Sequence, residues 1–142
     1  MATTWSLSFQ QVEEKNPAAS GAESPETAYP LYGLAELYRH QGKYEQAELL
    51  YQRTLSIREQ RLEAEHPDTA ESLQGLADLY HEQGRHMEAK LLYQRALYIR
   101  EQAWGSQHPK TIETRKHFID LLHAMRLYEE ASQLEATQSE LQ

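Results

Sequence analysis

Residues 66–108 read HPDTAESLQGLADLYHEQGRHMEAKLLYQRALYIREQAWGSQH, and from Pro67 onward they form one complete copy of a unit that the chain repeats. A shift of 42 residues aligns Pro25 with Pro67 and Pro67 with Pro109. More than half of the residues from 25 to 66 are identical to their counterparts from 67 to 108. Self-similarity at a fixed period is the sequence signature of a repeat architecture.

Each copy contains two segments with apolar residues at helical spacing, separated by a glycine. In the middle copy, Leu73, Leu76 and Tyr80 fall on one face of a first helix, and Gly84 can adopt the left-handed conformation that closes it. A second helix follows and ends near Trp104, and two antiparallel helices joined in this way form a hairpin that stacks on the next. We therefore expect an all-α, right-handed solenoid. The buried side of the second helix is expected to carry Ala89, Leu92, Tyr93, Ala96, Leu97, Ile99 and Arg100.

Composition supports a helical protein and argues against several functional classes. The chain has 142 residues, no cysteine and a formal charge of −8. Without cysteine there is no disulfide framework and no thiolate metal site. The negative charge argues against a nucleic-acid surface, which needs clustered lysine and arginine. No apolar run approaches the length of a membrane span, and the first residues lack the pattern of a signal peptide, so we expect a cytoplasmic location.

The first 24 residues differ from the repeats and are expected to form an N-terminal helix and a linker. The apolar residues here, at spacings that allow one short amphipathic helix from Leu7 to Glu14, are Trp5, Leu7, Phe9 and Val12, and a small polar segment follows. These aromatic residues would cover the apolar face of the first repeat, or would dock to another protein. The repeat array itself spans residues 25–142, with copies at 25–66, 67–108 and 109–142.

Two departures from the repeat indicate where the array begins and ends. Pro30 lies shortly after Pro25, so we expect the first helix to start late, between Ala28 and Pro30. In the third copy Arg126 replaces the turn glycine and Glu135 replaces a tyrosine. The last helix, from Leu127 to about Gln138, is mostly polar, as a capping repeat needs to be. The residues of this helix expected to reach the core are Tyr128, Ala131 and Leu134.

The repeats resemble the tetratricopeptide repeat. Its pattern is filled by Leu73, Leu76, Ala77, Tyr80, Gly84, Ala89, Tyr93 and Ala96. The longer period, the His-Pro-Asp-Thr opening and the second-helix pattern are similar to the repeats of kinesin light chain. In that family a Leu-Asn-Asn triplet faces the groove and can bond an extended peptide, but here the triplet is Leu73-Gln74-Gly75. The departure argues against kinesin-type cargo recognition, and it makes Gln74 and Gly75 the first candidates for a different recognition function.

The segment from Thr4 to Ala19 resembles the region that follows the nucleotide-binding core in bacterial signalling ATPases of the NB-ARC type. That core contains a phosphate-binding G-x-x-x-x-G-K-[ST] loop, and no such motif occurs in this chain. The resemblance implies an alternative function: a regulatory remnant of such an ATPase that lacks the nucleotide-binding core.

Catalytic and metal-binding patterns are absent from the sequence. No Gly-x-Ser-x-Gly motif occurs, and the acidic residues are spread along helix faces, so we expect no enzyme activity and no cofactor. His66 and His108 precede the helix-start prolines and belong to the repeat pattern. His81 and His86 approximate the zinc motif H-E-x-x-H, but the second histidine comes one residue late and Gly84 ends the helix between them, so the two rings are not expected to share a face. We therefore expect no metal site.

The resemblance to tetratricopeptide arrays implies that the first helix of each hairpin lines a concave groove, and we interpret the protein as a non-catalytic scaffold that binds a peptide or protein segment there. The exposed groove positions form a polar, mainly acidic surface, so a basic or neutral partner is expected. With about three repeats the array is at the lower limit for a stable stack, so the chain is either a monomer or a weak self-associating species that pairs through its open end. The groove residues are Tyr32, Glu36, Arg39, His40, Glu71, Gln74, Asp78, His81, Glu82, Glu113, Lys116, Asp120 and His123.

Overall fold

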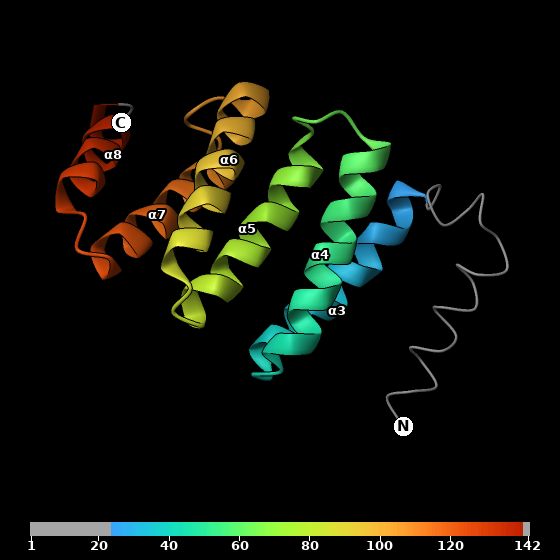
Figure 1. Ribbon diagram of the computed structural model, residues 1–142. Helices are drawn as coiled ribbons and strands as arrows, with labels where there is room; N and C mark the ends of the chain where they lie inside the picture. Colours follow the sequence, from blue (N-terminus) through green and yellow to red (C-terminus); the bar gives the residue numbers. More distant parts are fainter. Residues whose placement is uncertain (1–23, 141–142) are drawn as a thin grey trace, which may run out of the picture.

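The computed structural model describes residues 24–140, and in this range the chain forms three helical hairpins joined by short turns (Figure 1). The all-α solenoid expected from the sequence is confirmed. The helix expected around Trp5 and Phe9 and the linker after it lie outside the described residues. The elements in chain order are η1 (Pro25–Thr27), α3 (Ala28–His40), α4 (Tyr44–Arg61), α5 (Pro67–Glu82), α6 (His86–Trp104), α7 (Pro109–Ala124) and α8 (Tyr128–Glu140).

Histidine side chains cap the first helix of the second and third hairpins. The Nδ1 atom of His66 accepts a hydrogen bond from the backbone N–H of Asp68 (3.0 Å), and Nδ1 of His108 accepts one from Lys110 (3.1 Å). Each histidine precedes a proline. Proline has no backbone N–H, but the N–H groups of the first helical turn have no acceptor within the helix, so no hydrogen bond is lost there. The repeated His-Pro pair is therefore a helix start, and in the first hairpin Ser24 caps the 3-10 turn η1.

The first helix of the first hairpin starts after Pro25 and contains Pro30 in its first turn. Helix α3 starts at Ala28, after the 3-10 turn that contains Pro25, so the expected late start is confirmed. Pro30 then lies in the first turn of α3, where the backbone N–H groups have no partner within the helix.

The turns inside the hairpins share one backbone conformation. Gly42 and Gly84 have φ values of 78° and 77°, in the left-handed region that closes a helix. Arg126 occupies the third turn with a φ of 61°. A residue with a Cβ is strained in this region, so the third hairpin keeps the turn of the first two at an energetic cost.

The core follows the apolar positions of the repeat. Leu73, Leu76 and Tyr80 of α5 and Tyr93 and Ala96 of α6 are all buried, as expected. In α8, Ala131 is buried and Leu134 packs against the core in a half-buried position. The expectation for Tyr128 was wrong, because 57% of its surface is exposed. Its ring instead packs edge-on against His123 (5.8 Å between centroids), since no further hairpin follows within the described residues to cover it.

The hairpins stack so that the first helices lie closer together than the second helices. The backbone of α5 contacts both α3 and α7, whereas α4, α6 and α8 make no backbone contact with one another in the described part of the chain. The surface formed by α3, α5 and α7, here called the inner face, is therefore on the concave side. The surface formed by α4, α6 and α8 is called the outer face.

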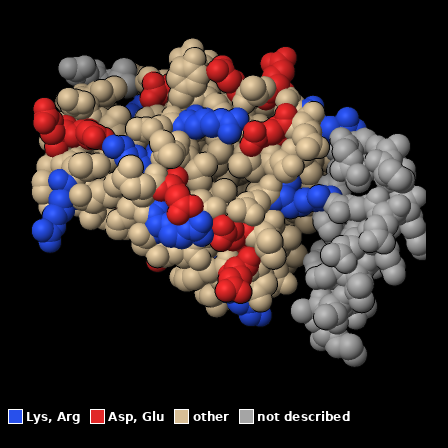
Figure 2. Space-filling view, in the orientation of Figure 1, with Lys and Arg blue, Asp and Glu red and all other residues tan. Residues whose placement is uncertain are grey.

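Long side chains bridge the helices of the outer face. Arg95 of α6 lies 3.6 Å from the carboxylate of Glu59 on α4, and Lys90 lies 3.0 Å from that of Glu130 on α8. Figure 2 views the side on which α4 and α6 are in front, and there acidic and basic side chains are interspersed without a patch of one sign. None of the helices described is both long and apolar enough to cross a membrane.

Candidate interaction face

The inner face presents nearly all of the residues that the sequence assigned to the groove. The carboxylates among them are mostly engaged: Glu71 pairs with Arg58 (3.1 Å), and Glu113 lies 3.7 Å from Lys110. His123 bonds Glu135 (2.8 Å). The positions that are at least partly exposed are Tyr32, Glu36, Arg39, His40, Glu71, Asp78, His81, Glu82, Glu113, Lys116, Asp120 and His123.

Gln74 was expected on the groove surface, and this expectation was wrong. Its residue surface is only 7% exposed, and its side-chain oxygen accepts hydrogen bonds from Arg100 and from the hydroxyl of Thr114 (2.8 Å). Arg100 is itself buried at the junction between α6 and α7, where its guanidinium needs acceptors. Gln74 therefore joins the second hairpin to the third and is not available to a partner.

Gly75 also has a packing role in place of the expected recognition role. A Cβ atom at this position would lie 2.6 Å from Cε1 of Tyr51, closer than two such atoms can approach. The ring of Tyr51, from the preceding hairpin, occupies the space that a side chain would need. The absence of a side chain at Gly75 thus permits the close stacking of the first two hairpins.

A first cluster of hydrogen bonds on the inner face centres on the hydroxyl of Tyr51. This hydroxyl donates to Glu36 and accepts a hydrogen bond from Nε of Arg39 (3.0 Å). The other two nitrogens of the guanidinium contact Glu36 (3.1 Å) and, across the hairpin boundary, Glu82 (2.6 Å). Burial raises the pKa of Tyr51, so the hydroxyl stays protonated. One arginine thus bridges three acceptors on three helices.

A second cluster lies on the next hairpin and centres on Asp78. The Tyr93 hydroxyl donates to Oδ1 of Asp78, and Nδ1 of His117 lies 2.9 Å from the same oxygen. Burial, together with the charge of Asp78, raises the pKa of Tyr93. The hydrogen bond to Asp78 raises the pKa of His117. This cluster therefore favours a neutral tyrosine and a charged histidine beside one carboxylate.

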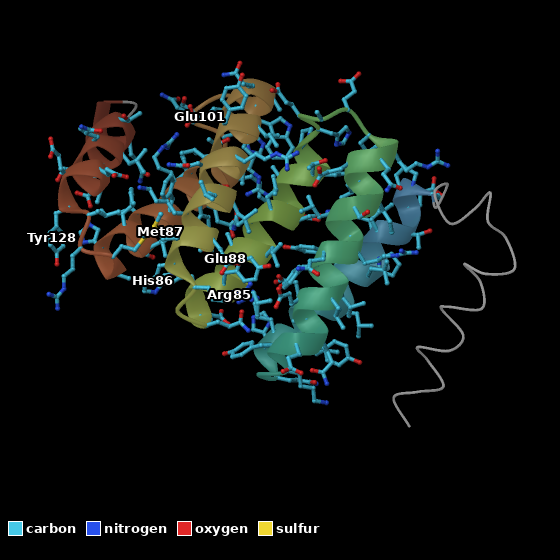
Figure 3. All side chains as sticks on the ribbon, viewed as in Figure 1. Arg85, His86, Met87, Glu88, Glu101 and Tyr128 are labelled. Carbon is cyan, nitrogen blue, oxygen red and sulfur yellow. The ribbon has the colours of Figure 1, made fainter. Side chains whose placement is uncertain are left out.

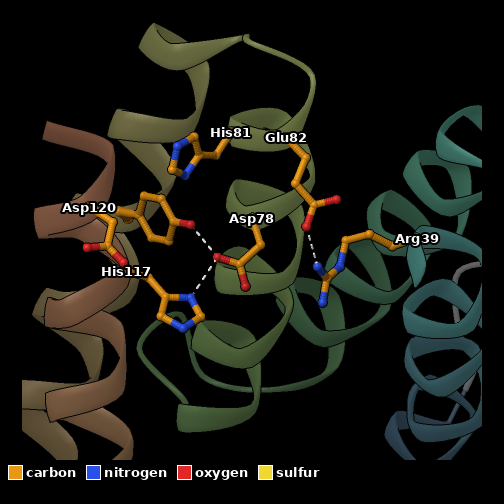
Figure 4. A pocket seen from close by; sticks show the side chains of 7 residues that line it. Arg39, Asp78, His81, Glu82, His117 and Asp120 are labelled. Atoms are coloured by element: carbon orange, nitrogen blue, oxygen red, sulfur yellow. Dashed lines mark hydrogen bonds and ion pairs between the residues drawn. The ribbon is translucent and has the colours of Figure 1, made fainter. Parts of the chain in front are cut away.

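A pocket of about 230 Å³ opens beside the second cluster (Figure 4). The side chains of Asp78 and His117 form its floor, and those of His81, Glu82 and Asp120 surround it. Asp120 is exposed and forms no hydrogen bond or ion pair with any described residue. The lining residues are Arg39, Asp78, His81, Glu82, Tyr93, His117 and Asp120.

His81 and His86 lie on two different helices, and their rings contact each other across the turn between them. Their ring centroids are 5.6 Å apart in an edge-to-face arrangement, because the Gly84 turn brings the start of α6 back against the end of α5. Burial, and then the proximity of His86, lowers the pKa of His81, so this ring is neutral near pH 7. Among residues 24–140, no group of three or more His, Asp or Glu side chains is arranged to hold a metal ion.

Three residues of these clusters were not predicted as site residues. Tyr93 was expected on the buried side of the second helix, and Tyr51 is its counterpart in the first copy. A buried tyrosine hydroxyl needs a hydrogen-bond partner, and an acidic residue precedes each tyrosine by 15 positions. His117 stands where Gly75 stands in the preceding copy, 42 residues earlier. The replacement of glycine by histidine was the sequence signal for a site residue, since the His117 side chain reaches the carboxylate of Asp78 in the preceding hairpin.

The outer side also carries fixed polar groups. Figure 3 shows Arg85 and Glu88 at the start of α6, where they form an ion pair (2.7 Å). Arg85 also donates a hydrogen bond to Glu48 of α4 (3.0 Å), and Glu48 accepts one from the Tyr80 hydroxyl (2.9 Å). Hydrogen-bonded groups therefore join neighbouring hairpins on both faces, and the pocket beside Asp78 opens among those of the inner face.

Comparisons with known proteins agree with this architecture. The sequence profile of the tetratricopeptide repeat family matches residues 26–102. A crystal structure of a kinesin light chain-like protein from Podosopora anserina, with nearly identical TPR-like repeats, is similar to the chain at 26% identity and a TM-score of 0.71. A crystal structure of a point variant of that protein gives the same values. The alignment covers 79% of this chain but 53% of that one, so this chain spans about half the length of that structure. No curated protein matches the sequence.

Proposed function

Because this chain belongs to the tetratricopeptide repeat family, we propose that it is a non-catalytic scaffold that captures a segment of a protein partner on its inner face. Repeats of this family generally mediate protein–protein interactions. Stacked hairpins create an extended concave surface, and such surfaces are where solenoid proteins bind their partners.

The observation that carries the proposal is the fixed arrangement of polar groups on the inner face. Arg39, Tyr51 and Asp78 are held by hydrogen bonds within and between hairpins, so they lose little conformational freedom when a partner binds. On the outer face Arg85 is fixed in a similar way by Glu48 and Glu88, but the pocket beside Asp78 lies among the fixed groups of the inner face. A preorganised polar surface favours recognition of a specific segment.

The charge of the inner face favours a basic or neutral segment. The pocket beside Asp78 is lined by three carboxylates, from Asp78, Glu82 and Asp120, by the guanidinium of Arg39, and by the imidazoles of His81 and His117. Glu82 is paired with Arg39, whereas Asp120 is exposed. An acidic segment would meet uncompensated like charge there, and like-charge contacts across an interface are strongly unfavourable.

Recognition on this face is proposed to depend on side chains. The positions at which kinesin light chain carries paired asparagines are Gln74 and Gly75 here, and both are buried. They are therefore closed to a partner's backbone, and the accessible groups are the carboxylates, histidines and Lys116 around them.

An array of peptides that differ only in their charged residues tests the function. The intact chain should bind basic or neutral peptides more tightly than acidic ones. Asp120→Lys reverses a charge on the inner face and should weaken binding of the basic peptides by at least about tenfold. Glu45→Lys makes the same charge change at an exposed position of α4 on the outer face and should have little effect. Tighter binding of acidic peptides, or equal effects of the two variants, would refute the proposal.

A further inference from the structure

The two hydrogen-bonded clusters of the inner face are copies of each other, and the second copy lacks a guanidinium. The shift of 42 residues places Glu36 on Asp78 and Tyr51 on Tyr93. In both copies the tyrosine hydroxyl donates to the carboxylate. The same shift places Arg39 on His81. The chain therefore supplies an arginine to the first tyrosine–carboxylate pair and does not supply one to the second.

The first copy shows how this pair binds a guanidinium. Arg39 donates through Nε to Tyr51, through Nη2 to Glu36 and through Nη1 to Glu82 of the following hairpin. The planar fork of arginine suits acceptors that lie in different directions, which a single ammonium group cannot contact equally well. The protein thus contains its own example of an occupied site.

In the second copy the corresponding space is open. His81 packs against His86, and it forms no hydrogen bond with the Tyr93–Asp78 pair. Asp78 uses Oδ1 for both Tyr93 and His117, which leaves Oδ2 without a hydrogen bond to any described residue. Asp120 borders the same space and is also unpaired within the described range. Figure 4 shows these groups arranged around the pocket.

We propose that this pocket receives an arginine side chain of the bound partner, whose guanidinium takes the place that Arg39 takes in the first copy. The inference rests on the proposed function, because it names the chemistry of one residue in the segment that the inner face captures. The guanidinium would donate to the Tyr93 hydroxyl, to the free oxygen of Asp78 and to Asp120. Hydrogen bonds between charged groups are stronger than those between neutral groups. The positive charge of the partner's arginine should therefore contribute most of the selectivity for arginine over a neutral side chain.

The variant His81→Arg provides a direct test, because it gives the second copy the arginine that the first copy has. The new side chain should fill the pocket and leave the fold intact, since position 81 is only partly buried. Gln94→Arg introduces the same charge at an exposed position of α6 on the outer face and serves as the control. Tyr93→Phe removes the hydroxyl acceptor without adding charge, and it keeps the test valid if His81→Arg proves unstable.

The probes are three capped pentapeptides, Gly-Gly-Xaa-Gly-Gly, in which Xaa is arginine, lysine or citrulline. Citrulline has the shape of arginine without its charge. Titrations into the 15N-labelled intact chain, followed by NMR, report both affinity and location. The arginine peptide should shift the resonances of Asp78, His117 and Asp120, and it should bind at least about tenfold more tightly than the citrulline peptide. His81→Arg and Tyr93→Phe should each weaken its binding, and Gln94→Arg should not.

Two results would overturn the inference. Equal binding of the arginine and citrulline peptides would show that the charge is not recognised, and unchanged binding to His81→Arg would show that the pocket is not the site. In either case, basic peptides from the array that still shift other inner-face resonances would leave the scaffold function standing. If no peptide shifts any inner-face resonance, the scaffold function fails, and the inference fails with it.

Discussion

Arg126 adopts a left-handed backbone conformation in the turn between α7 and α8, where the two earlier turns have glycine. Replacing it with glycine should stabilise the protein, because the contact between Cβ and the backbone is removed. Glycine also gains more freedom in the unfolded chain, so the net gain should be about 0.5–1 kcal/mol. Urea unfolding followed by circular dichroism measures the change. The reciprocal variant Gly84→Ala should lose stability, and a loss for Arg126→Gly would contradict the account.

His117 should stabilise the fold more at acidic pH than at basic pH. Its hydrogen bond to Asp78 raises its folded-state pKa above the ordinary value of 6.5. The contribution is therefore fully present below pH 6.5 and is lost as the pH rises through the raised folded-state pKa. His117→Ala should cost more stability at about pH 5.5 than at about pH 9, as measured by urea unfolding at both pH values.

A double-variant cycle isolates this effect. With Asp78→Asn as the background, the largest cause of the raised pKa is gone and the weaker effects of Glu113 and Asp120 remain, so the cost of His117→Ala should differ much less between the two pH values. An equal cost of the single variant at both pH values would show that the His117–Asp78 contact does not hold a proton in the folded state.

The histidine caps of α5 and α7 should contribute to the stability of the protein. His66→Ala removes the acceptor for the backbone N–H of Asp68 and should cost about 1 kcal/mol, the usual value for loss of a helix N-cap. His66→Asp supplies another acceptor and a charge that suits the helix N-terminus, so it should retain most of the stability. Urea unfolding of the two variants and the unaltered protein at one pH measures the two losses. Equal losses for the two variants would argue against capping.

The elements were predictable from the sequence because their signals are local. The His-Pro pairs predicted the helix starts, Gly42 and Gly84 predicted the turns, and Pro30 predicted a late first helix. The groove was predictable as a set of positions on the first helices. Gln74 and Gly75 were misassigned because their roles depend on distant partners: Arg100 is 26 residues from Gln74, and the ring that excludes a side chain at Gly75 belongs to Tyr51 of the preceding hairpin.

Because the hairpins stack on one another, leucines at equivalent positions of two repeats should contribute differently to the free energy of unfolding. Leu79 is fully buried in the core that the hairpins share, whereas its counterpart Leu37 in the first hairpin is 51% exposed. Leu79→Ala should cost about 2–5 kcal/mol, since it leaves a cavity. Leu37→Ala should cost less than about 1 kcal/mol. Thermal unfolding of the two variants distinguishes them, and similar costs would mean that the first hairpin is covered much as the others are.

The exposed side chain of Leu37 in the first hairpin is a candidate contact for self-association of the whole molecule. If two copies pair through the face that carries Leu37, the apparent mass in light scattering should rise with concentration, and Leu37→Lys should abolish the rise. A constant monomer mass over the full concentration range would exclude such pairing.

Site-specific photo-cross-linking tests the central claim, that a partner segment binds the inner face, most directly. A photoreactive residue is placed either at Lys116 on α7 or at Gln94 on α6, two exposed positions on the inner and outer faces respectively. Each protein is irradiated with the tightest basic peptide from the array. The account predicts an adduct from position 116 and none from position 94. An adduct from position 94 alone would place the binding surface on the outer face and contradict the account.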